Sequence, residues 1–303
     1  MMQNMCCAKA GAVEALDAAS VGAFAFVGKD GRPRACPVTP YLYAGEAVVS
    51  STLAFTAKVA AVRRDPRVAL LAGGCLVRGR ATLDVDLTSK TFDERVRRQE
   101  LRKYPPSRLL LAIPGHRRLL WWYVGRASIA IPIGDWARAP GSDRMTVTFL
   151  DGEFPRIVPL DPATDTSGDE IPVPVRHEGA ACLLVHDEEP DMADLRQLTL
   201  HGVIRDGTFR AERRAGSLDP SHPGPLDQLR TLRALGHAAR KNRPVLARWA
   251  RETLSRTGLQ FLSRHLPEPV SLGFSADGLG QLGDELDHPG VLVRGDRGLG
   301  EVL

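Results

Sequence analysis

The sequence lacks any long hydrophobic run, because no stretch of about 18 consecutive apolar residues occurs in its 303 residues. This absence argues against a membrane-spanning helix. The first residues, MMQNMCCAKAGAVEALD, do not show the charged region and apolar segment of a secretory signal, so none is expected. Cysteine is also scarce. Its five scattered residues, an odd number, do not suggest a disulfide framework and predict a reducing, cytoplasmic environment.

The net charge is small, at +4. A content of 43% hydrophobic and 25% charged residues is typical of a soluble globular protein. Basic residues gather in two segments, 95–108 and 233–256. Both segments have apolar residues at helical spacing, which predicts amphipathic helices with a solvated basic face. No nucleic-acid reader motif accompanies them, so nucleic acid is not an expected partner. No cluster of His and Cys predicts a metal site.

Residues 21–83 alternate β-rich runs with turn signals. VGAFAFVG, ACPVTPYLY and AVVSS read as strands, with a hairpin turn at Asp30-Gly31 after the first. A short helix over 56–64 precedes two further strands, RVALLAGG and CLVRGRATLDVD. Residues 88–119 are predicted to be helical, and LLWWYVGRASIAIPI returns to strand. This order favours a mainly β protein with a closed antiparallel barrel and a few helices.

The second half of the chain resembles the first. KDGRPRACPV (29–38) matches LDGEFPRIVPL (150–160), and CLVRGRATL (75–83) matches QLTLHGVIRDG (197–207). Pro155 lies 122 residues after Pro33, and Gly202 lies 123 residues after Gly79, which indicates a tandem duplication. We therefore expect four regions: a first barrel domain at 1–140, a degenerate second copy at 141–225, basic amphipathic helices interrupted at Pro244 over 226–266, and a flexible tail at 267–303.

One lysine of the first copy occupies an unfavourable position. In SSTLAFTAKVAAVRRDP (50–66), Thr56 is the expected N-cap, which puts Lys58 in the first turn of the helix. The helix dipole opposes a cation there by roughly 0.3–1 kcal/mol. An anion bound at the helix N-terminus would remove this cost, and the nearby hydroxyls would bind the same anion. The segment therefore suggests a phosphate site, although an exposed lysine beside capping hydroxyls is the simpler alternative.

The ordered set RPRACPV, AVVSSTLAFTAKVAAVRRDPRVALL and VRGRATL resembles the pyridoxamine 5′-phosphate oxidase-like split barrels, a superfamily of flavin- and deazaflavin-dependent oxidoreductases. The resemblance implies a split β-barrel, here duplicated into a pseudo-dimer. It also implies contacts to the cofactor ring and phosphate from nine residues: Arg34, Pro37, Val38, Val49, Ser50, Ser51, Thr52, Thr56 and Lys58. The phosphate oxidase itself has Ser-Arg-Lys where this chain has Thr56-Ala57-Lys58. That difference argues against pyridoxamine phosphate as the substrate.

In this superfamily two barrels pack together around the cofactor, so a duplicated chain is expected to bind one cofactor, with an intramolecular pseudo-dimer or a homodimer forming the site. The expected function is hydride transfer between FMN or a deazaflavin coenzyme and a small-molecule substrate. The alternatives are a non-catalytic carrier, sensor or scavenger of flavin or, less favoured, haem, and an interaction protein without cofactor. Haem would need an axial ligand such as His177, His186 or His201. No catalytic residue is assigned, although His201 is a possible proton donor.

Overall fold

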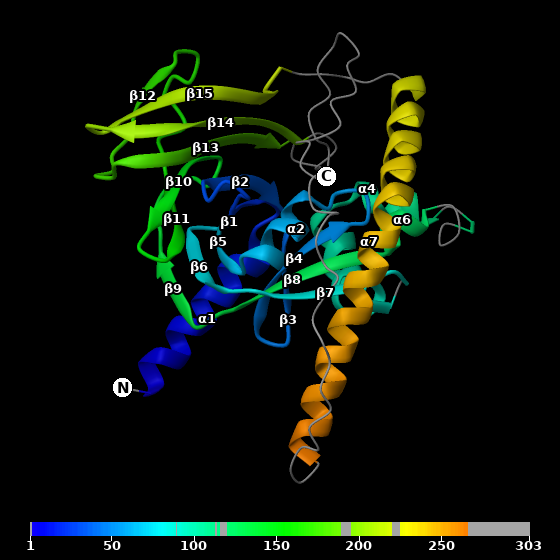
Figure 1. Ribbon diagram of the computed structural model, residues 1–303. Helices are drawn as coiled ribbons and strands as arrows, with labels where there is room; N and C mark the ends of the chain where they lie inside the picture. The colour runs from blue at the N-terminus through cyan, green and yellow to red at the C-terminus, as the bar shows by residue number, and fades with distance from the viewer. Residues whose placement is uncertain are drawn as a thin grey trace, which may run out of the picture.

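The computed structural model describes residues 2–88, 90–112, 114–115, 120–188, 195–219 and 225–265. Within these residues the strands form three antiparallel sheets, two from the first half of the chain and one from the second (Figure 1). The tail expected at 267–303 lies outside the described residues. Among the described helices, none combines the length and the apolar character needed to cross a membrane.

The first sheet contains five strands and begins with the predicted hairpin. Gly31 has a φ of +72° in the turn after Asp30, a conformation that glycine adopts without strain. In spatial order the strands are β2 (Pro33–Val38), β1 (Gly22–Val27), β5 (Arg67–Ala72), β6 (Cys75–Arg80) and β9 (Asp135–Arg138).

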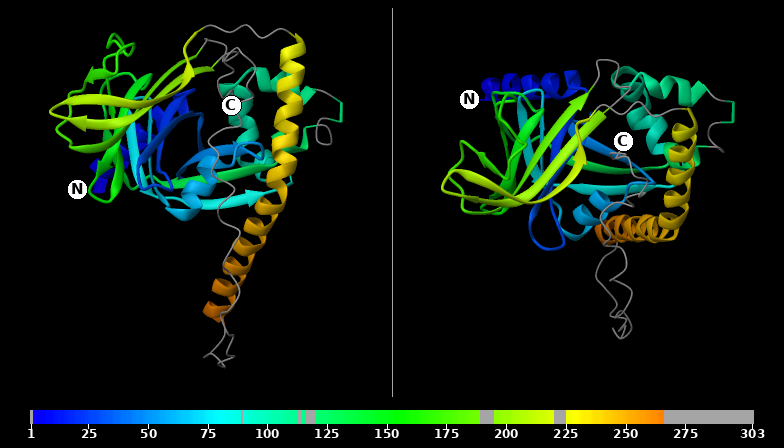
Figure 2. Two further views of the ribbon diagram at one scale, coloured as in Figure 1. Left: turned by 45° about the horizontal axis from the view of Figure 1, so that its top comes forward. Right: turned by 90° about the horizontal axis from the view of Figure 1, so that it is seen from above.

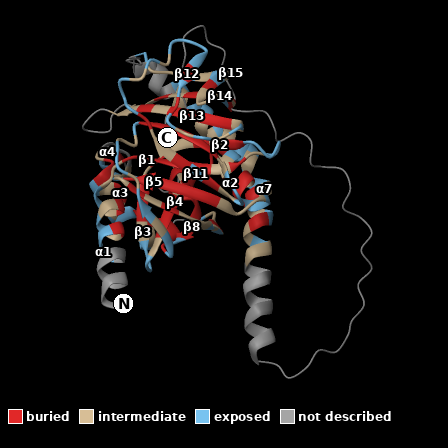
Figure 3. Ribbon diagram, turned by 90° about the vertical axis from the view of Figure 1, so that its left-hand side faces the viewer, coloured by how far each residue is buried: buried red, intermediate tan, exposed pale blue. Residues whose placement is uncertain are grey.

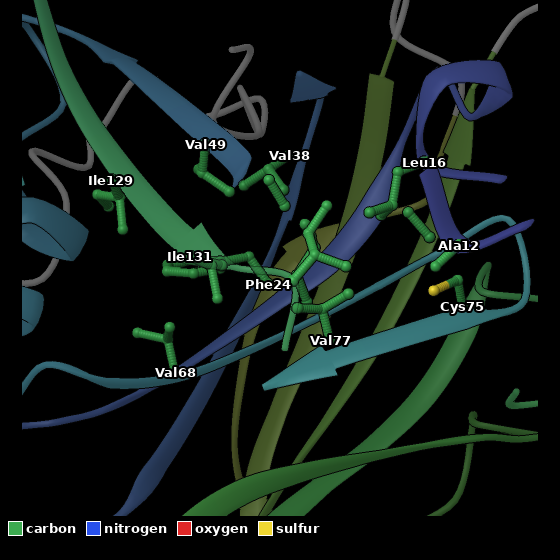
Figure 4. Close-up of a cluster of buried hydrophobic side chains, with 14 of the residues drawn as sticks. Ala12, Leu16, Phe24, Val38, Val49, Val68, Cys75, Val77, Ile129 and Ile131 are labelled. Atoms are coloured by element: carbon green, nitrogen blue, oxygen red, sulfur yellow. The ribbon is translucent and has the colours of Figure 1, made fainter. Parts of the chain in front are cut away.

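The second sheet packs against the first to form the barrel. Its strands in spatial order are β3 (Pro40–Tyr43), β4 (Glu46–Thr52), β8 (Arg126–Pro132) and β7 (Thr82–Asp86). One residue separates β2 from β3 and one separates β6 from β7, so the chain passes between the sheets at two corners. Apolar side chains from both sheets meet in the core, among them Phe24 and Val77 from the first and Val49 and Ile129 from the second (Figure 4).

The third sheet confirms the predicted duplication. Its spatial order is β11 (Phe154–Pro159), β10 (Met145–Asp151), β13 (Gly179–Glu188), β14 (Leu195–Arg205), β15 (Thr208–Ser217) and β12 (Glu170–Pro172). The order β11-β10-β13-β14 repeats the order β2-β1-β5-β6 of the first sheet. The second copy is reduced, because residues 160–178 contain only β12 where the first copy has β3, β4 and a helix.

The two copies pack face to face. Ala23, Ala25 and Ala35 of the first sheet lie against Cys182 and Leu184 of β13, and all five are buried. Small alanine side chains allow the two sheets to approach closely. The third sheet therefore stands against one side of the barrel (Figure 2), and the first hairpin and β14 lie near each other.

Seven helical segments are described around the sheets. They are α1 (Met2–Ala18), α2 (Ala57–Arg64), the π-helical turn η1 (Phe92–Val96), α3 (Arg97–Lys103), α4 (Pro106–Ala112), α6 (Trp121–Val124) and α7 (Pro225–His265). Helices α1 and α7 lie on opposite sides of the barrel (Figure 3). Helix α1 packs through Ala12 and Leu16, and α7 packs through Ala239, Leu246 and Trp249.

Two sequence-based predictions about helices were wrong. Pro244 does not interrupt the C-terminal helix, which runs unbroken through it. Proline removes one backbone hydrogen bond, but Pro244 is exposed while the opposite face of α7 is buried, so packing keeps the helix together. Trp121–Val124 form a helical turn rather than a strand, and β8 starts only at Arg126.

Candidate functional site

A pocket opens where the end of β4, the start of α2 and the start of β8 meet. Its empty space, counted together with adjoining space that is open to solvent, is about 730 Å³. Four further elements, β2, β3, α3 and α6, contribute to its wall, and β14 of the second copy adds one residue. The lining comprises Pro37, Val38, Thr39, Tyr41, Ser50, Ser51, Thr52, Lys58, Glu100, Tyr104, Tyr123, Arg126 and Leu195.

Six of the nine residues implied by the family resemblance line this pocket: Pro37, Val38, Ser50, Ser51, Thr52 and Lys58. The structure places the other three outside the lining. Val49 is fully buried and points into the core of the barrel (Figure 4). Arg34 forms an ion pair with Asp30 at 2.7 Å. Thr56 occupies the N-cap position of α2, but its side chain makes no capping hydrogen bond.

The hydroxyls of β4 differ in how they are used. Ser51 Oγ donates to the carbonyl of Phe55 at 2.5 Å, in the loop between β4 and α2. Ser50 and Thr52 alternate with Ser51 and therefore point to the opposite face of the sheet. Ser50 Oγ and Thr52 Oγ1 are buried and have no hydrogen-bond partner among the described residues. A buried hydroxyl without a partner costs free energy, so both are suited to bind a ligand in the pocket.

Lys58 lies in the first turn of α2, as expected from the sequence, and its side chain is half-buried. The first backbone N–H groups of a helix have no carbonyl partner within the helix, and the dipole makes this end positive. The first turn of α2 contains no acidic residue to balance that charge. An ammonium group, a helix N-terminus and two unpaired hydroxyls thus converge on one pocket, an arrangement suited to an anion such as phosphate.

The floor of the pocket contains a buried polar cluster that the sequence did not predict. Glu100 of α3 is 6% exposed and accepts hydrogen bonds from three side chains. Tyr41 Oη donates to Oε2, Tyr123 Oη donates to Oε1 at 2.6 Å, and Arg126 Nη2 donates to Oε1 at 3.2 Å. The guanidinium of Arg126 also packs against the rings of Phe92 and Tyr123, at 4.8 and 4.5 Å from their centroids. We call Tyr41, Glu100, Tyr123 and Arg126 the Glu100 cluster.

Burial sets the protonation of groups around the floor. Desolvation, reinforced by the nearby Glu100 carboxylate, holds the pKa of Tyr41 and Tyr123 well above the usual value and raises the pKa of Tyr104 to about 12. These phenols therefore stay protonated at neutral pH and act as donors. Beside them, desolvation lowers the pKa of Lys103 to about 8, and its Nζ donates to the carbonyls of Leu16 and Pro40.

Comparison with solved structures finds partial matches, each to about two-fifths of this chain. A putative pyridoxamine 5′-phosphate oxidase from Listeria innocua is 19% identical and matches over 43% of this chain and 96% of its own, with a TM-score of 0.31. An F420 reductase is 15% identical over 41% and 94%, with a TM-score of 0.29. A FAD-binding protein from Mesorhizobium loti is 22% identical over 41% and 85%, with a TM-score of 0.27. No family model matches the sequence, and no curated protein is significantly similar to it.

The first copy has a split-barrel fold. This assignment agrees with the resemblance expected from the sequence, and its basis is the pairing and order of the chain's own strands. The likenesses above are too weak to indicate an activity. In this split barrel the strand end that precedes α2 and the start of α2 itself form one wall of the pocket, so the hydroxyls and Lys58 of the segment 50–58 lie together.

The three histidines considered from the sequence lie outside the pocket of the split barrel. Desolvation and the nearby Arg34 and Arg213 lower the pKa of His201 to about 4, so it is neutral at pH 7 and holds no proton to donate as an imidazolium. Buried His186 lies 2.9 Å from the carbonyl of Asp143 and 3.1 Å from Glu188. His177 stacks on Phe149. In the part of the chain that the structure describes, none of these residues lines the pocket to ligate haem.

Proposed function

We propose that the pocket binds the phosphate of FMN or of a deazaflavin coenzyme, and that the protein is an oxidoreductase acting on a small molecule. One observation carries the proposal: Ser50 and Thr52, with buried and unpaired hydroxyls, line the same pocket as Lys58 at the start of α2. The pocket has both the charge and the unused donors that a phosphate needs.

The remainder of the lining fits a flat ring system attached to such a phosphate. Pro37, Val38 and Leu195 present apolar surface, and the last of these belongs to the second copy. The two copies would then form one site per chain, with the first binding phosphate and the second covering the ring. A bound flavin or deazaflavin would supply the hydride chemistry. The chain's own residues would bind the cofactor, orient it and exclude water from one side of its ring.

The test is a titration of the purified protein with FMN and with the deazaflavin coenzyme, followed by absorbance and fluorescence. We expect one of them to bind at one molecule per chain. Lys58→Ala should weaken this binding by roughly tenfold or more, because a charge-assisted hydrogen bond is lost, while the fold is retained. Lys241→Ala, which removes an exposed lysine of α7, is the matched control and should bind like the wild type.

Four outcomes would contradict the proposal in whole or in part. If the wild type bound neither compound, FMN and the deazaflavin coenzyme would both be excluded as its cofactor. A stoichiometry near two would show that the copies do not share one site. Unchanged affinity in Lys58→Ala would show that the phosphate lies elsewhere. Tight binding with no hydride transfer to any of a panel of small-molecule acceptors would instead support the non-catalytic carrier.

A further inference from the structure

We propose that Arg126 is a second cation for the phosphate, supplied from β8 in addition to Lys58 of α2. This inference rests on the proposed function. At the start of α2 the chain has Thr56-Ala57-Lys58, so Lys58 is the only cation of that triplet. The structure shows a second cation in the same pocket, from a strand that lies about 70 residues further along the chain.

The position of Arg126 follows from strand pairing. Thr52 of β4 lies directly opposite Arg126 of β8, and Ser50 lies opposite Ser128. Directly paired residues project to the same face of a sheet, so Arg126 and Ser128 join the face that already contains the unpaired hydroxyls of Ser50 and Thr52. Ser128 Oγ is buried and has no partner among the described residues either.

The guanidinium of Arg126 is held in place but its donors are not fully used. The side chain is 4% exposed, and Nη2 donates to Glu100. Nε is buried without a hydrogen-bond partner in the described part of the chain. A buried N–H group of a charged side chain is rarely left unpaired. The hydrogen bond to Glu100 and the contacts with the rings of Phe92 and Tyr123 limit how the group can turn, so an incoming oxygen anion would find the donor already oriented.

Glu100 would act as a positioning residue for Arg126. The two phenols and the guanidinium already occupy its carboxylate oxygens. The carboxylate therefore fixes Arg126 and keeps a buried charge compensated when the pocket is empty. The lining contains Lys58 and Arg126 against this one carboxylate. That excess of positive charge favours a dianionic phosphate.

The test measures how much each variant prefers the phosphorylated ligand. The readout is the Kd of riboflavin divided by the Kd of FMN, or the same ratio for the deazaflavin coenzyme and its phosphate-free chromophore. Arg126→Gln should lower this ratio by roughly ten- to a hundredfold and change riboflavin binding by less than about twofold. Arg126→Lys should recover part of the ratio, since it keeps the charge. Arg248→Gln, on the exposed face of α7, is the control.

Because Arg126→Gln leaves Glu100 unpaired and risks misfolding, the double variant Glu100→Gln with Arg126→Gln replaces the ion pair by neutral amides. We expect the double variant to fold and to lose the same preference. An equal loss of riboflavin and FMN affinity would show that Arg126 only supports the fold, and an unchanged ratio would show that it does not contact the phosphate. If Lys58→Ala lowers the ratio and Arg126→Gln does not, the proposed function stands and this inference fails. If the wild type binds neither cofactor, both fail.

Discussion

Replacing Thr52 by valine separates what the hydroxyl does for binding from what it does for stability. Valine has nearly the same shape as threonine and is equally suited to a strand, so the change removes little more than the hydroxyl. Thr52 is 7% exposed and its Oγ1 has no partner among the described residues. We therefore expect opposite effects: the free protein becomes more stable and cofactor binding becomes weaker.

The magnitudes follow from the burial of that one atom. A buried hydroxyl without a hydrogen bond costs on the order of 1–3 kcal/mol, so its removal should raise the free energy of unfolding of the free protein by about 1 kcal/mol or more. A hydrogen bond to a charged group contributes roughly 1.5–3 kcal/mol, so its loss should weaken FMN or deazaflavin binding by roughly ten- to a hundredfold.

The assays are urea denaturation of the cofactor-free protein and titration with the cofactor. Thr148→Val is the matched control, because Thr148 is fully buried in β10 with an unpaired Oγ1 but lies outside the pocket. It should stabilise the protein to a similar degree and leave cofactor binding unchanged. A Thr52→Val variant that is less stable and binds the cofactor as the wild type does would refute the reasoning, since the hydroxyl would then be bonded within the fold.

Two further predictions concern stability. The pKa of Lys103 is about 8 in the folded chain and near 10.4 when unfolded, so the unfolded state binds more protons between these values. The free energy of unfolding of the wild type, relative to that of Lys103→Met, should therefore rise by at most about 3 kcal/mol from pH 8 to 10. If this difference between the two proteins did not change with pH, the burial of the ammonium would be contradicted. Gly202→Ala should lower the melting temperature sharply, because the added Cβ would lie 1.9 Å from the carbonyl oxygen of Arg210. Gly11→Ala, at a position of α1 with open space around it, should instead raise the free energy of unfolding by roughly 0.5–1 kcal/mol. Equal melting temperatures for the two glycine variants would contradict this account of the β14–β15 contact.

The fold was predictable where the signal was local or repeated. The Asp30-Gly31 turn and the alternation of short apolar runs predicted the first hairpin, because a two-residue periodicity and a glycine at positive φ are visible in one short stretch. The duplication was predictable because Pro155 and Gly202 follow Pro33 and Gly79 at nearly equal spacing. The structure confirms it through the repeated strand order, although the second copy keeps only one of the two sheets.

The Glu100 cluster was not predictable in the same way. The segment 95–108 reads as a basic amphipathic helix in water, yet Glu100 and Lys103 are 6% and 5% exposed. Charged side chains are buried only when distant groups compensate them. The partners of Glu100 come from β3, α6 and β8, and those of Lys103 come from α1 and the start of β3. No spacing within the segment contains that information.

The same limit explains why the role of the C-terminal helix could not be predicted. The basic residues of 233–256 predicted a solvated basic face, but α7 also supports the loop between β4 and α2. Asn242 Nδ2 donates to the carbonyls of Leu53 and Ala54, each at 3.2 Å. Arg63, in the last turn of α2, lies over the ring of Trp249 at 5.1 Å. Thr56 provides no local cap, and these long-range contacts instead support the loop before α2 and the last turn of α2, the helix that contains Lys58. A binding segment in the first copy thus depends for its geometry on a helix nearly 190 residues later.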